Sequence, residues 1–365
     1  MRVLQIGLGN NPGGVEAFVM NYYQELVSYK IQFDFACMYD HIAHEGKIKA
    51  LGGKVYYVPN VKRNPRGYYG ALYEILQRED YDVVHVNMLS AANIVPLRVA
   101  RKVGVPKIIA HSHNASAPGI LRRIMHSWNK PFVERYATHY FACGEKAAQW
   151  LFSRKTRESG RVTLIANAID VDKYRYSKEE RGKIRKQLGL EGKLVIGHVG
   201  RFEEQKNHKK MLKIMGKLYE KRQDIVLVCI GEGVKKKEME QIAEKNGLTK
   251  AICFPGKQEN IGPYLSAMDV FLMPSLFEGL PFTLLEAQAN GLSCVVSDTI
   301  TEEAYVRPQA ICALSLQAEE SSWSEAVLQM AAQGRCSYVE AEEALTRHGF
   351  NIKSEARRLR DLYQM

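Results

Sequence analysis

Residues 270–289 read VFLMPSLFEGLPFTLLEAQA, and this stretch decides the class of fold. Its first four residues are all apolar and end at Pro274, which is typical of a short buried strand. Pro281 suits the first turn of a helix, so we expect a helix over 282–290. A buried strand that runs through a short loop into a helix is one half of a βαβ unit, from which parallel sheets are built.

The same alternation of short apolar runs and amphipathic stretches continues in both directions along the chain. It predicts an α/β protein with parallel sheets covered by helices on both faces. The strands form two series, which predicts two Rossmann-like domains whose sheets face each other across a cleft. The seam is expected at 172–192, a polar and charge-rich stretch, with domain boundaries near 1–172 and 173–349. The expected strands are 3–7, 33–38, 55–58, 83–86, 107–111 and 139–143, then 194–199, 225–230, 252–255, 270–273 and 294–296; the expected helices include 16–27, 70–77, 209–220, 235–245, 260–267 and 282–290.

Composition limits the class of protein. The chain has 365 residues, of which 46% are hydrophobic and 25% charged, as in a soluble two-domain globular protein rather than a disordered or fibrous one. Its seven cysteines are scattered without a CxxC pair, which argues against a disulfide framework or a structural zinc site and favours a reducing cytoplasm. We expect neither a signal peptide nor a membrane span, because no stretch has the required pattern.

Two acidic residues flank the start of the helix expected at 282–290. Glu278 lies in the preceding loop, and Glu286 lies about one and a half turns inside the helix. Carboxylates accept hydrogen bonds from sugar hydroxyls, and the free amides of Phe282 and Thr283 suit phosphate. A ligand with hydroxyls at both ends and phosphate in the middle is a nucleotide sugar. The alternative is that one acid caps the helix and the other lies on its surface.

A basic loop, GRFEEQKNH at 200–208, follows the strand expected at 194–199. Its Arg201 and Lys206 can converge at the carboxyl end of that strand. Arginine offers a planar fork and lysine a compact charge, so the two could neutralise a diphosphate without a metal ion. The alternative is a solvated surface loop.

A glycine-rich loop, GLGNNPGG at 7–14, follows the first expected strand. It does not match GxGxxG, because Pro12 stands where the third glycine would be, and this argues against a dinucleotide site. The backbone at Gly13 and Gly14 could contact a diphosphate or an acceptor at the start of a helix. The alternative is a plain strand-to-helix turn.

Together these three elements resemble the retaining family 4 glycosyltransferases of GT-B fold, the group 1 transferases, in particular those that assemble bacterial polysaccharides. The resemblance runs from the N-terminus to about Asp298. IANAID at 165–170 resembles the family's Pro-Asn-Gly-Val-Asp junction, with Ala168 in place of glycine, and FPG at 254–256 precedes the base-binding loop. Residues 351–363 look like the final helix that returns to the first domain, so the segment of about 350–365 is expected to join that domain.

The resemblance also implies roles for single residues. Arg201 and Lys206 would bind the donor diphosphate and stabilise it as the leaving group. Glu278 would contact hydroxyls of the hexose, and Glu286 those of the ribose. A histidine after a strand of the first domain would line the reaction site, and both His111 and His113 qualify. The remaining donor contacts would be Gly13, Gly14, the backbone of Lys257 and Gln258 at the base, and Gly279, Leu280 and Phe282 near the phosphate.

The activity that the resemblance implies is transfer of a hexose or N-acetylhexosamine, with retention of configuration, from a nucleoside-diphosphate sugar to a glycan or lipid-linked saccharide. The donor is expected to be a UDP-sugar. No metal and no cofactor are expected, because Arg201 and Lys206 already neutralise the diphosphate and the Asp-x-Asp at Asp170 to Asp172 falls at the domain junction rather than beside the donor motifs. The sugar, the acceptor and the linkage stay open, since they depend on loops such as 60–70 and 112–119.

Two other functions compete with this one. A nucleotide-sugar epimerase of the same fold would release sugar without an acceptor, but the basic loop beside the two acids argues against it. A nucleic-acid-binding protein would interleave aromatic residues with its cations, whereas the run 121–132 has one tryptophan and no RNA-binding motif, so no nucleic acid is expected.

The positive charge of the chain, +11 in total, is concentrated in one region. Residues 98–161 contain 13 lysines and arginines against three acids. Within them LRRIMHSWNKPF, at 121–132, mixes apolar and cationic side chains, as membrane-interface segments do. This predicts a cytoplasmic protein held peripherally on the anionic inner face of the plasma membrane. The alternative is a solvated helix with Trp128 in the core.

Overall fold

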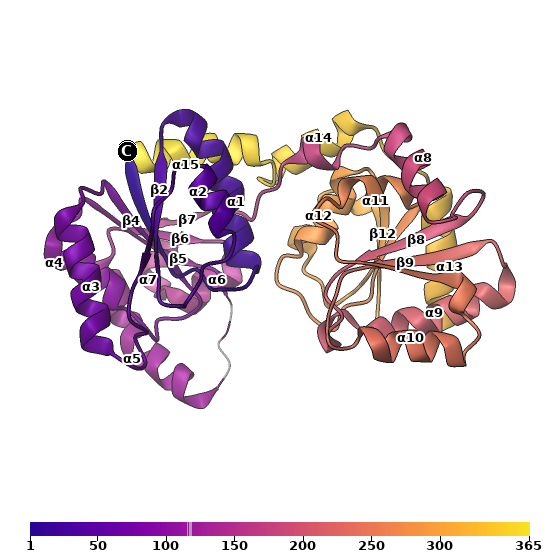
Figure 1. Cartoon of the computed structure of the whole chain (residues 1–365), viewed down its shortest axis with the longest axis horizontal. Coiled ribbons are helices and arrows are strands. Elements are labelled where there is room, and N and C mark those ends of the chain that lie inside the picture. Colours follow the sequence, from indigo (N-terminus) through magenta and orange to yellow (C-terminus); the bar gives the residue numbers. More distant parts are fainter. Residues whose placement is uncertain (115, 117–118) are drawn as a thin grey trace. The chain divides into compact units, whose positions relative to one another are not determined.

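The computed structural model of the chain describes residues 1–114, 116 and 119–365. Contacts divide the chain into two units (Figure 1): unit 1 comprises Met1–Ala168 and Ile352–Met365, and unit 2 comprises Ile169–Asn351. Each unit is built on one parallel sheet with helices on both faces, so the predicted α/β class with two Rossmann-like domains is confirmed.

In the described part of unit 1, seven parallel strands form a sheet in the order β3-β2-β1-β4-β5-β6-β7. The first six lie within about two residues of their expected positions, whereas the edge strand β7 was not expected because its three residues are only half-buried. Successive residues of the strands alternate between two apolar cores, one on each face of the sheet. The strands are β1 (Arg2–Ile6), β2 (Gln32–Cys37), β3 (Val55–Tyr57), β4 (Val83–Met88), β5 (Lys107–Ser112), β6 (His139–Ala142) and β7 (Val162–Leu164); the helices are α1 (Gly14–Leu26), α2 (Glu45–Ala50), α3 (Pro65–Arg78), α4 (Val95–Val103), α5 (Ile120–Tyr136), α6 (Glu145–Leu151), α7 (Arg154–Glu158) and α15 (Ile352–Gln364).

The C-terminal helix α15 belongs to unit 1 and packs beside α1, where Figure 1 draws it in yellow against the indigo part of the chain. Its Tyr363 places the hydroxyl 2.6 Å from Nδ1 of His85 in β4. Lys107 of β5 donates from its ammonium to the carbonyl oxygens of Leu362 and Tyr363 at 2.7 and 2.8 Å. A cation at this end of a helix also offsets the negative end of the helix dipole. The last residues of the chain are therefore fixed to the middle of the first sheet.

In unit 2, the residues that the structure describes form a six-stranded parallel sheet in the order β10-β9-β8-β11-β12-β13. Three of the five expected strands have the bounds that were predicted, and the edge strand β13 was missed for the same reason as β7. The strands are β8 (Leu194–Val199), β9 (Ile225–Ile230), β10 (Ile252–Gly256), β11 (Val270–Met273), β12 (Ser293–Ser297) and β13 (Ile311–Leu314); the α-helices are α8 (Lys178–Gln187), α9 (His208–Lys221), α10 (Lys236–Lys245), α11 (Gly262–Ala267), α12 (Phe282–Ala289), α13 (Glu320–Ala332) and α14 (Tyr338–Arg347).

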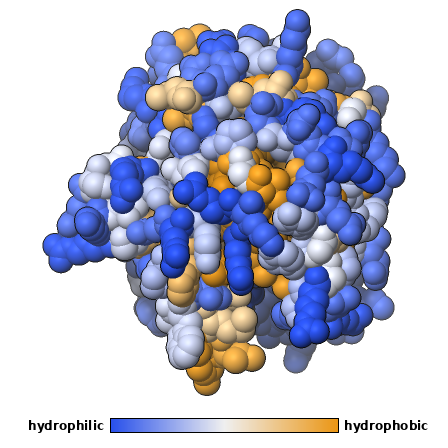
Figure 2. Space-filling model, turned by 90° about the vertical axis from the view of Figure 1, so that its left-hand side faces the viewer, coloured by the Kyte–Doolittle hydropathy of each residue, from blue (hydrophilic) through white to orange (hydrophobic). Residues whose placement is uncertain are grey.

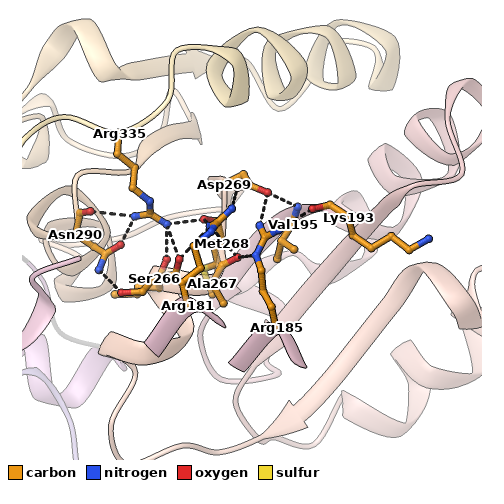
Figure 3. A network of polar contacts seen from close by, with 11 residues as sticks. Arg181, Arg185, Lys193, Val195, Ser266, Ala267, Met268, Asp269, Asn290 and Arg335 are labelled. Carbon is orange, nitrogen blue, oxygen red and sulfur yellow. Dashed lines mark hydrogen bonds and ion pairs between the residues drawn. The ribbon is translucent and has the colours of Figure 1, made fainter. Parts of the chain in front are cut away.

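The charge-rich stretch 172–192, where the seam was expected, lies in unit 2 and carries α8, which packs against α11. Arg181 and Arg185 of α8 each place a guanidinium nitrogen 2.6 Å from a carboxylate oxygen of Asp269, and together with Arg335 they bind carbonyl oxygens at the end of α11 (Figure 3). Burial, reinforced by the neighbouring Arg181, lowers the pKa of Arg335 to about 10. Charges in the stretch that suggested a seam between domains therefore hold α8 against the end of α11.

Candidate functional site

Two loops of unit 2 meet at the carboxyl ends of β8 and β11, which are neighbours in the sheet. Nζ of Lys206 lies 2.6 Å from Oε1 of Glu278, and the side chain of Gln205 donates to the other oxygen of that carboxylate at 3.2 Å. The side chains of Lys206 and Glu278 are only 15% and 8% exposed. The structure thus joins two of the expected site residues in a largely buried ion pair.

Hydrogen bonds to the backbone hold these two loops in register. The amide of Leu276 donates to the carbonyl oxygen of Gln205 at 2.8 Å, and the side chain of Asn207 donates to that of Pro274 at 3.0 Å. Asn207 itself has a φ of 53°, a left-handed conformation that asparagine tolerates better than most residues. It ends a short 3-10 helix, η3 (Glu204–Lys206), and begins α9. The position of Lys206 is therefore fixed by the turn on which it lies.

Arg201 lies in the same loop but has a different partner. One of its guanidinium nitrogens is 2.9 Å from Oε1 of Glu203, and the side chain is largely exposed. Of the two predicted cations, only Lys206 is thus paired with Glu278. Because exposed ion pairs contribute little free energy, Arg201 can exchange Glu203 for an anionic ligand at small cost.

A further loop at this edge, GEG at 231–233 after β9, was missed by the sequence reasoning. Gly231 has a φ of 147°, and a Cβ there would lie 2.0 Å from the carbonyl oxygen of Gly200. The amide of Phe202 donates to the carbonyl oxygen of Glu232 at 3.0 Å. The GEG loop therefore supports the loop that carries Arg201 and Lys206. A G-x-G pair directly after a strand was the signal that could have found it.

Two buried histidines, His198 and His208, lie beneath the basic loop with their rings 5.1 Å apart. Burial lowers the pKa of His208 to about 4 and that of His198 well below its usual range. The ring of His208 also stacks on Phe202 at 4.1 Å. Both histidines are consequently neutral at pH 7, so they support the loop by packing and add no positive charge to it.

Glu286 lies on α12 and receives a hydrogen bond of 2.8 Å from the hydroxyl of Tyr174. Burial raises the pKa of Glu286 to about 7, while the bond from Tyr174 acts in the opposite direction. The carboxyl is therefore poised between its two forms near neutral pH, and a ligand that donates hydroxyls to it would favour the ionised form. Tyr174 ends the 3-10 helix η2 (Val171–Tyr174), far from Glu286 in sequence, and nothing in its local pattern pointed to this role.

The start of α12 has unused polar groups. Its N-cap residue, Pro281, makes no side-chain capping hydrogen bond, so the amides of Phe282 and Thr283 are not capped in that way. Oγ1 of Thr283 and Oγ of Ser275 are buried and have no hydrogen-bond partner among the described residues. Because buried polar atoms are normally paired, the unpaired hydroxyl of Thr283 makes this helix start a candidate site for a polar ligand. The expected donor contacts Gly279 and Leu280 lie in the loop just before it, exposed and half-buried respectively.

Lys257 and Gln258 follow β10 and lie at the same edge of the sheet, because all its strands are parallel. The side chain of Gln258 donates to the carbonyl oxygen of Pro255 at 2.9 Å, and Lys257 is exposed. The amide of Gly231 donates to the carbonyl oxygen of Gly256 at 3.0 Å, which joins this loop to the GEG loop.

In unit 1, an acid of helix α1 already binds the glycine-rich loop. Gly13 is the N-cap of α1 and Gly14 its first residue, and both are exposed. The buried carboxylate of Glu16 accepts a hydrogen bond of 2.7 Å from the amide of Gly9. A Cβ on Gly13 would lie 2.8 Å from the other oxygen of that carboxylate. A nearby carboxylate repels anions, so this loop suits a ligand with hydroxyls better than a diphosphate.

The two candidate histidines differ in burial. His111, in β5, is fully buried; its Nδ1 lies 3.0 Å from Nε2 of His85, and its Nε2 has no partner within the part of the chain that is described. His113 follows the strand, is half-buried, and places Nε2 2.9 Å from Oδ1 of Asn87. Of the two, His113 is the one with surface that a ligand can reach.

The neighbours of His113 define its protonation. The side-chain nitrogen of Asn87 donates to Oε1 of Gln5 at 2.9 Å and to the carbonyl oxygen of Ile6 at 3.3 Å, so Oδ1 of Asn87 faces His113 as an acceptor. Burial lowers the pKa of His113 to about 3, so the ring is neutral at pH 7 and carries its proton on Nε2. Nδ1 is then an acceptor, suited to a ligand hydroxyl.

Within residues 1–114, 116 and 119–365, no group of three or more His, Cys, Asp or Glu side chains is arranged to hold a metal ion. Asp170 and Asp172, which form the Asp-x-Asp at the domain junction, have structural partners: Asp170 accepts from the amide of Asp172 at 3.2 Å, and the hydroxyl of Tyr338 donates to Asp172. Of the loop 112–119, residues 115, 117 and 118 lie outside the described residues.

Two family models match the chain. The model described as "Glycosyltransferase Family 4" matches residues 12–173, and the model described as "Glycosyl transferases group 1" matches residues 180–343. The first match falls almost entirely in unit 1 and the second lies within unit 2.

Several known proteins are similar to the chain. The putative glycosyltransferase EpsF of Bacillus subtilis (strain 168) is 34% identical over 371 residues, which cover 100% of this chain and 96% of that protein. The UDP-Gal:alpha-D-GlcNAc-diphosphoundecaprenol alpha-1,3-galactosyltransferase of Escherichia coli is 28% identical over 235 residues, 62% of this chain and 60% of that protein. Among solved structures, Anabaena Alr3699/HepE in complex with UDP has a TM-score of 0.82 at 16% identity over 100% of both chains. WaaG, a glycosyltransferase involved in lipopolysaccharide biosynthesis, has a TM-score of 0.68 at 17% identity over 99% of both chains.

Proposed function

The chain belongs to the group 1, family 4 glycosyltransferases of GT-B fold, and from this premise we propose that it transfers a hexose or N-acetylhexosamine from a nucleoside-diphosphate sugar to a glycan or lipid-linked saccharide, with retention of configuration. Family membership supports glycosyltransferase activity in glycan synthesis. The observation that carries the finer proposal is the buried pair of Lys206 and Glu278, with the uncapped start of α12 beside it in the same strand-to-helix unit.

In this proposal Lys206 and Arg201 bind the donor diphosphate. Negative charge on the leaving phosphate grows as the bond to the sugar breaks, so fixed positive charge stabilises the transition state more than the bound substrate. The ammonium of Lys206 is largely shielded from water, which strengthens its interaction with Glu278 and with any phosphate oxygen that binds beside that carboxylate. Backbone groups of Gly279, Leu280 and Phe282 add donors at the positively polarised start of α12. With these groups in place the reaction needs no divalent metal and no cofactor.

The acids bind the two sugars of the donor. Glu286, held by Tyr174, accepts hydrogen bonds from the ribose, and Glu278 does so from the hexose. The base meets the backbone of Lys257 and Gln258. In unit 1 the proposal assigns a sugar hydroxyl to His113 rather than to the fully buried His111, and an acceptor hydroxyl to the backbone of Gly13 and Gly14.

Retention of configuration is proposed to arise from attack on the same face that the diphosphate leaves. The bond from the anomeric carbon to the phosphate oxygen breaks, the acceptor oxygen bonds to that carbon, and the leaving phosphate oxygen takes the proton of the acceptor hydroxyl. Both carboxylate oxygens of Glu278 are already engaged, one by Lys206 and the other by Gln205, which favours a binding role over that of a nucleophile.

A uridine donor and a lipid-linked acceptor are supported by the names of similar proteins. The Escherichia coli relative is named as a UDP-galactose enzyme acting on a diphosphoundecaprenol-linked sugar, and Alr3699/HepE was solved with UDP and with UDP-glucose. Both family models, EpsF, the Escherichia coli relative and WaaG are described as transferases, so they lend no support to an epimerase. We also place the protein in the cytoplasm, peripherally on the inner face of the plasma membrane through region 98–161, in agreement with its surplus of positive charge.

No helix among the residues that the structure describes is long and apolar enough to cross a membrane.

The test is nucleotide binding with a matched lysine control. Thermal shift with a panel of nucleoside diphosphates and their sugars should single out UDP compounds, because a ligand at 100 times its Kd adds about 2.7 kcal/mol to folding stability. Calorimetry with UDP should then show a loss of at least about tenfold in affinity for Lys206→Ala and no change for Lys213→Ala, an exposed lysine of α9. Equal affinity of the two variants would overturn the site. Release of altered sugar without any acceptor would instead identify an epimerase.

A further inference from the structure

Helix α5 of unit 1 turns polar side chains toward the protein. The amide of Ala91 donates to Nδ1 of the buried His126 at 3.0 Å, and Nε2 of His126 lies 3.1 Å from the carbonyl oxygen of Trp150. The rings of His126 and Trp150 stack with their centroids 3.8 Å apart. Both nitrogens of the imidazole are thus used, one as acceptor and one as donor, and the ring is neutral because burial lowers its pKa.

Other polar residues of α5 bond to the same side. Nε of Arg122 donates to Oγ of Ser90 at 3.3 Å, and Nζ of Lys130 donates to the carbonyl oxygen of Gln149 at 3.0 Å. The side chain of Asn129 donates to the carbonyl oxygen of Ala92, just before α4, at 3.4 Å. The inner face of the helix is therefore largely polar and hydrogen-bonded to residues 90–92 and to α6, which is unusual for a surface helix, whose inner face is ordinarily apolar.

The apolar side chains of α5 lie on the outer side. Ile120, Ile124 and Trp128 repeat every four residues, a spacing that places them on one helix face. Trp128 is 80% exposed, so the alternative that it packs in the core is wrong. Figure 2 shows an apolar projection at its lower end, at the height of α5 in Figure 1. The exposed apolar residues of the helix are Ile120, Leu121, Ile124, Met125, Trp128 and Phe132, with 78%, 72%, 51%, 43%, 80% and 41% of their surfaces accessible.

Exposed positive charge lies on the same helix as this apolar face and on the helix next to it. Arg123 and Arg135 are exposed on α5 itself, and the neighbouring helix α4 exposes Arg98, Arg101 and Lys102. A contiguous apolar patch of this kind marks an interaction site, and its cationic border selects an anionic partner. Aliphatic residues and a tryptophan bordered by arginines match the boundary between lipid headgroups and acyl chains, where apolar and anionic groups meet within a few ångströms.

We propose that α5 docks unit 1 on an anionic lipid bilayer. Ile120, Ile124 and Trp128 enter the boundary between headgroups and acyl chains, while the exposed arginines and lysine of α4 and α5 lie against the lipid phosphates. The inward hydrogen bonds of His126 and Lys130 keep the helix in this orientation before it meets the membrane. This inference rests on the peripheral attachment proposed above and names the helix that makes it. The surface lies in unit 1 and the donor site in unit 2, so loss of vesicle binding and loss of the transfer reaction are distinguishable.

The experiment is co-sedimentation with vesicles of two compositions, phosphatidylcholine alone and phosphatidylcholine with about one third phosphatidylglycerol. The protein should bind the second and not the first. The double variant Ile124→Ser/Trp128→Ser and the single variant Arg123→Glu should each weaken binding by about tenfold or more. Matched controls in unit 2, Val339→Ser for an exposed apolar helix residue and Lys237→Glu for an exposed cation, should bind as the original protein does.

Tryptophan emission supplies a second readout. Trp128 should shift to the blue when anionic vesicles are added, and the shift should vanish in Trp128→Ser, because Trp323 is fully buried and Trp150 is stacked. Unchanged thermal midpoints of the variants will show that they fold. The proposal would be overturned if the protein bound both vesicle types equally. It would also be overturned if the Ile124→Ser/Trp128→Ser variant bound anionic vesicles as well as its control, Val339→Ser. A dimer in ultracentrifugation that Trp128→Ser dissociates would overturn it as well, since the face would then bind a second copy.

Discussion

Replacing Tyr174 by phenylalanine should shift the pH at which the protein gains affinity for a nucleotide sugar. Burial raises the pKa of Glu286 to about 7, and the bond of 2.8 Å from the hydroxyl of Tyr174 opposes that rise by favouring the carboxylate. A ribose diol donates hydrogen bonds and therefore needs the ionised acid. Affinity should consequently increase as the pH rises through about 7 in the original protein.

The size of the shift follows from the lost hydrogen bond. A hydrogen bond to a charged group contributes about 1.5–3 kcal/mol, and one pKa unit corresponds to about 1.4 kcal/mol. Tyr174→Phe should therefore raise the midpoint of the affinity profile by about one to two pH units. At pH 7 the affinity should fall by about tenfold, and most of it should return near pH 9.

The free energy of unfolding should change with pH in the opposite sense to the affinity, falling as the pH rises. The pKa of Glu286 is raised from 4.5 to about 7, so between these values the native protein holds a proton that the unfolded chain has lost. Protonation thus favours the fold, and this contribution, about 3 kcal/mol, should be present below pH 4.5 and lost as the pH rises to about 7. Glu286→Gln should remove this part of the pH dependence of the free energy of unfolding.

Calorimetric titration with a UDP-sugar between about pH 6 and pH 9 will measure the affinity profile, since the diphosphate of a UDP-sugar does not titrate in this range. Tyr219→Phe, a change on α9, should leave the midpoint where it is, and Glu286→Gln should flatten the profile. A midpoint that stays fixed or moves to lower pH in Tyr174→Phe would refute the reasoning, as would a profile that persists in Glu286→Gln.

Three shorter predictions concern other parts of the molecule. Glu278→Gln should lower kcat/KM for sugar transfer about a hundredfold while UDP affinity changes little, because Lys206 keeps its charge; single-turnover transfer and calorimetry measure the two. Gly231→Ala should lower the free energy of unfolding by more than about 2 kcal/mol, since its methyl group would lie 2.0 Å from a carbonyl oxygen. Gly216→Ala, in the open interior of α9, should raise that free energy by about 0.5–1 kcal/mol. Urea titration measures both. Tyr363→Phe removes the partner of a buried histidine and should cost about 1–3 kcal/mol, with hydrogen exchange of unit 1, but not of unit 2, becoming faster.

The sequence predicted most of the sheet elements because they are buried on both faces. Runs such as IVLVCI in β9 have no polar interruption, and the structure keeps their predicted bounds. The edge strands β7 and β13 have three and four residues that are at best half-buried, so periodicity had little to detect. The charges of 172–192 suggested a seam between domains, because the sequence pattern alone does not show that Arg181 and Arg185 form ion pairs with Asp269, more than 80 positions away.

The candidate site shows a similar division. The approach of Lys206 to Glu278 was predictable, because the carboxyl ends of parallel strands meet at one edge. The partnership of Tyr174 with Glu286 was not, because it joins residues 112 positions apart through a single hydroxyl. His111 and His113 lie on the same side of the extended chain, so the alternation of side chains along a strand could not tell which of them a ligand can reach. Their burial in the structure does, because His111 is fully buried and His113 only half-buried.

Unit 1 is built from the two ends of the chain, and this has a consequence for its synthesis. Residues 352–365 are synthesised only after all of Ile169–Asn351, so unit 1 can complete its fold only once the whole of unit 2 has been made. Until then β4 and β5 lack helix α15, which covers His85 and Lys107. A stop codon at position 353 would therefore leave unit 2 intact and unit 1 incomplete and prone to aggregate.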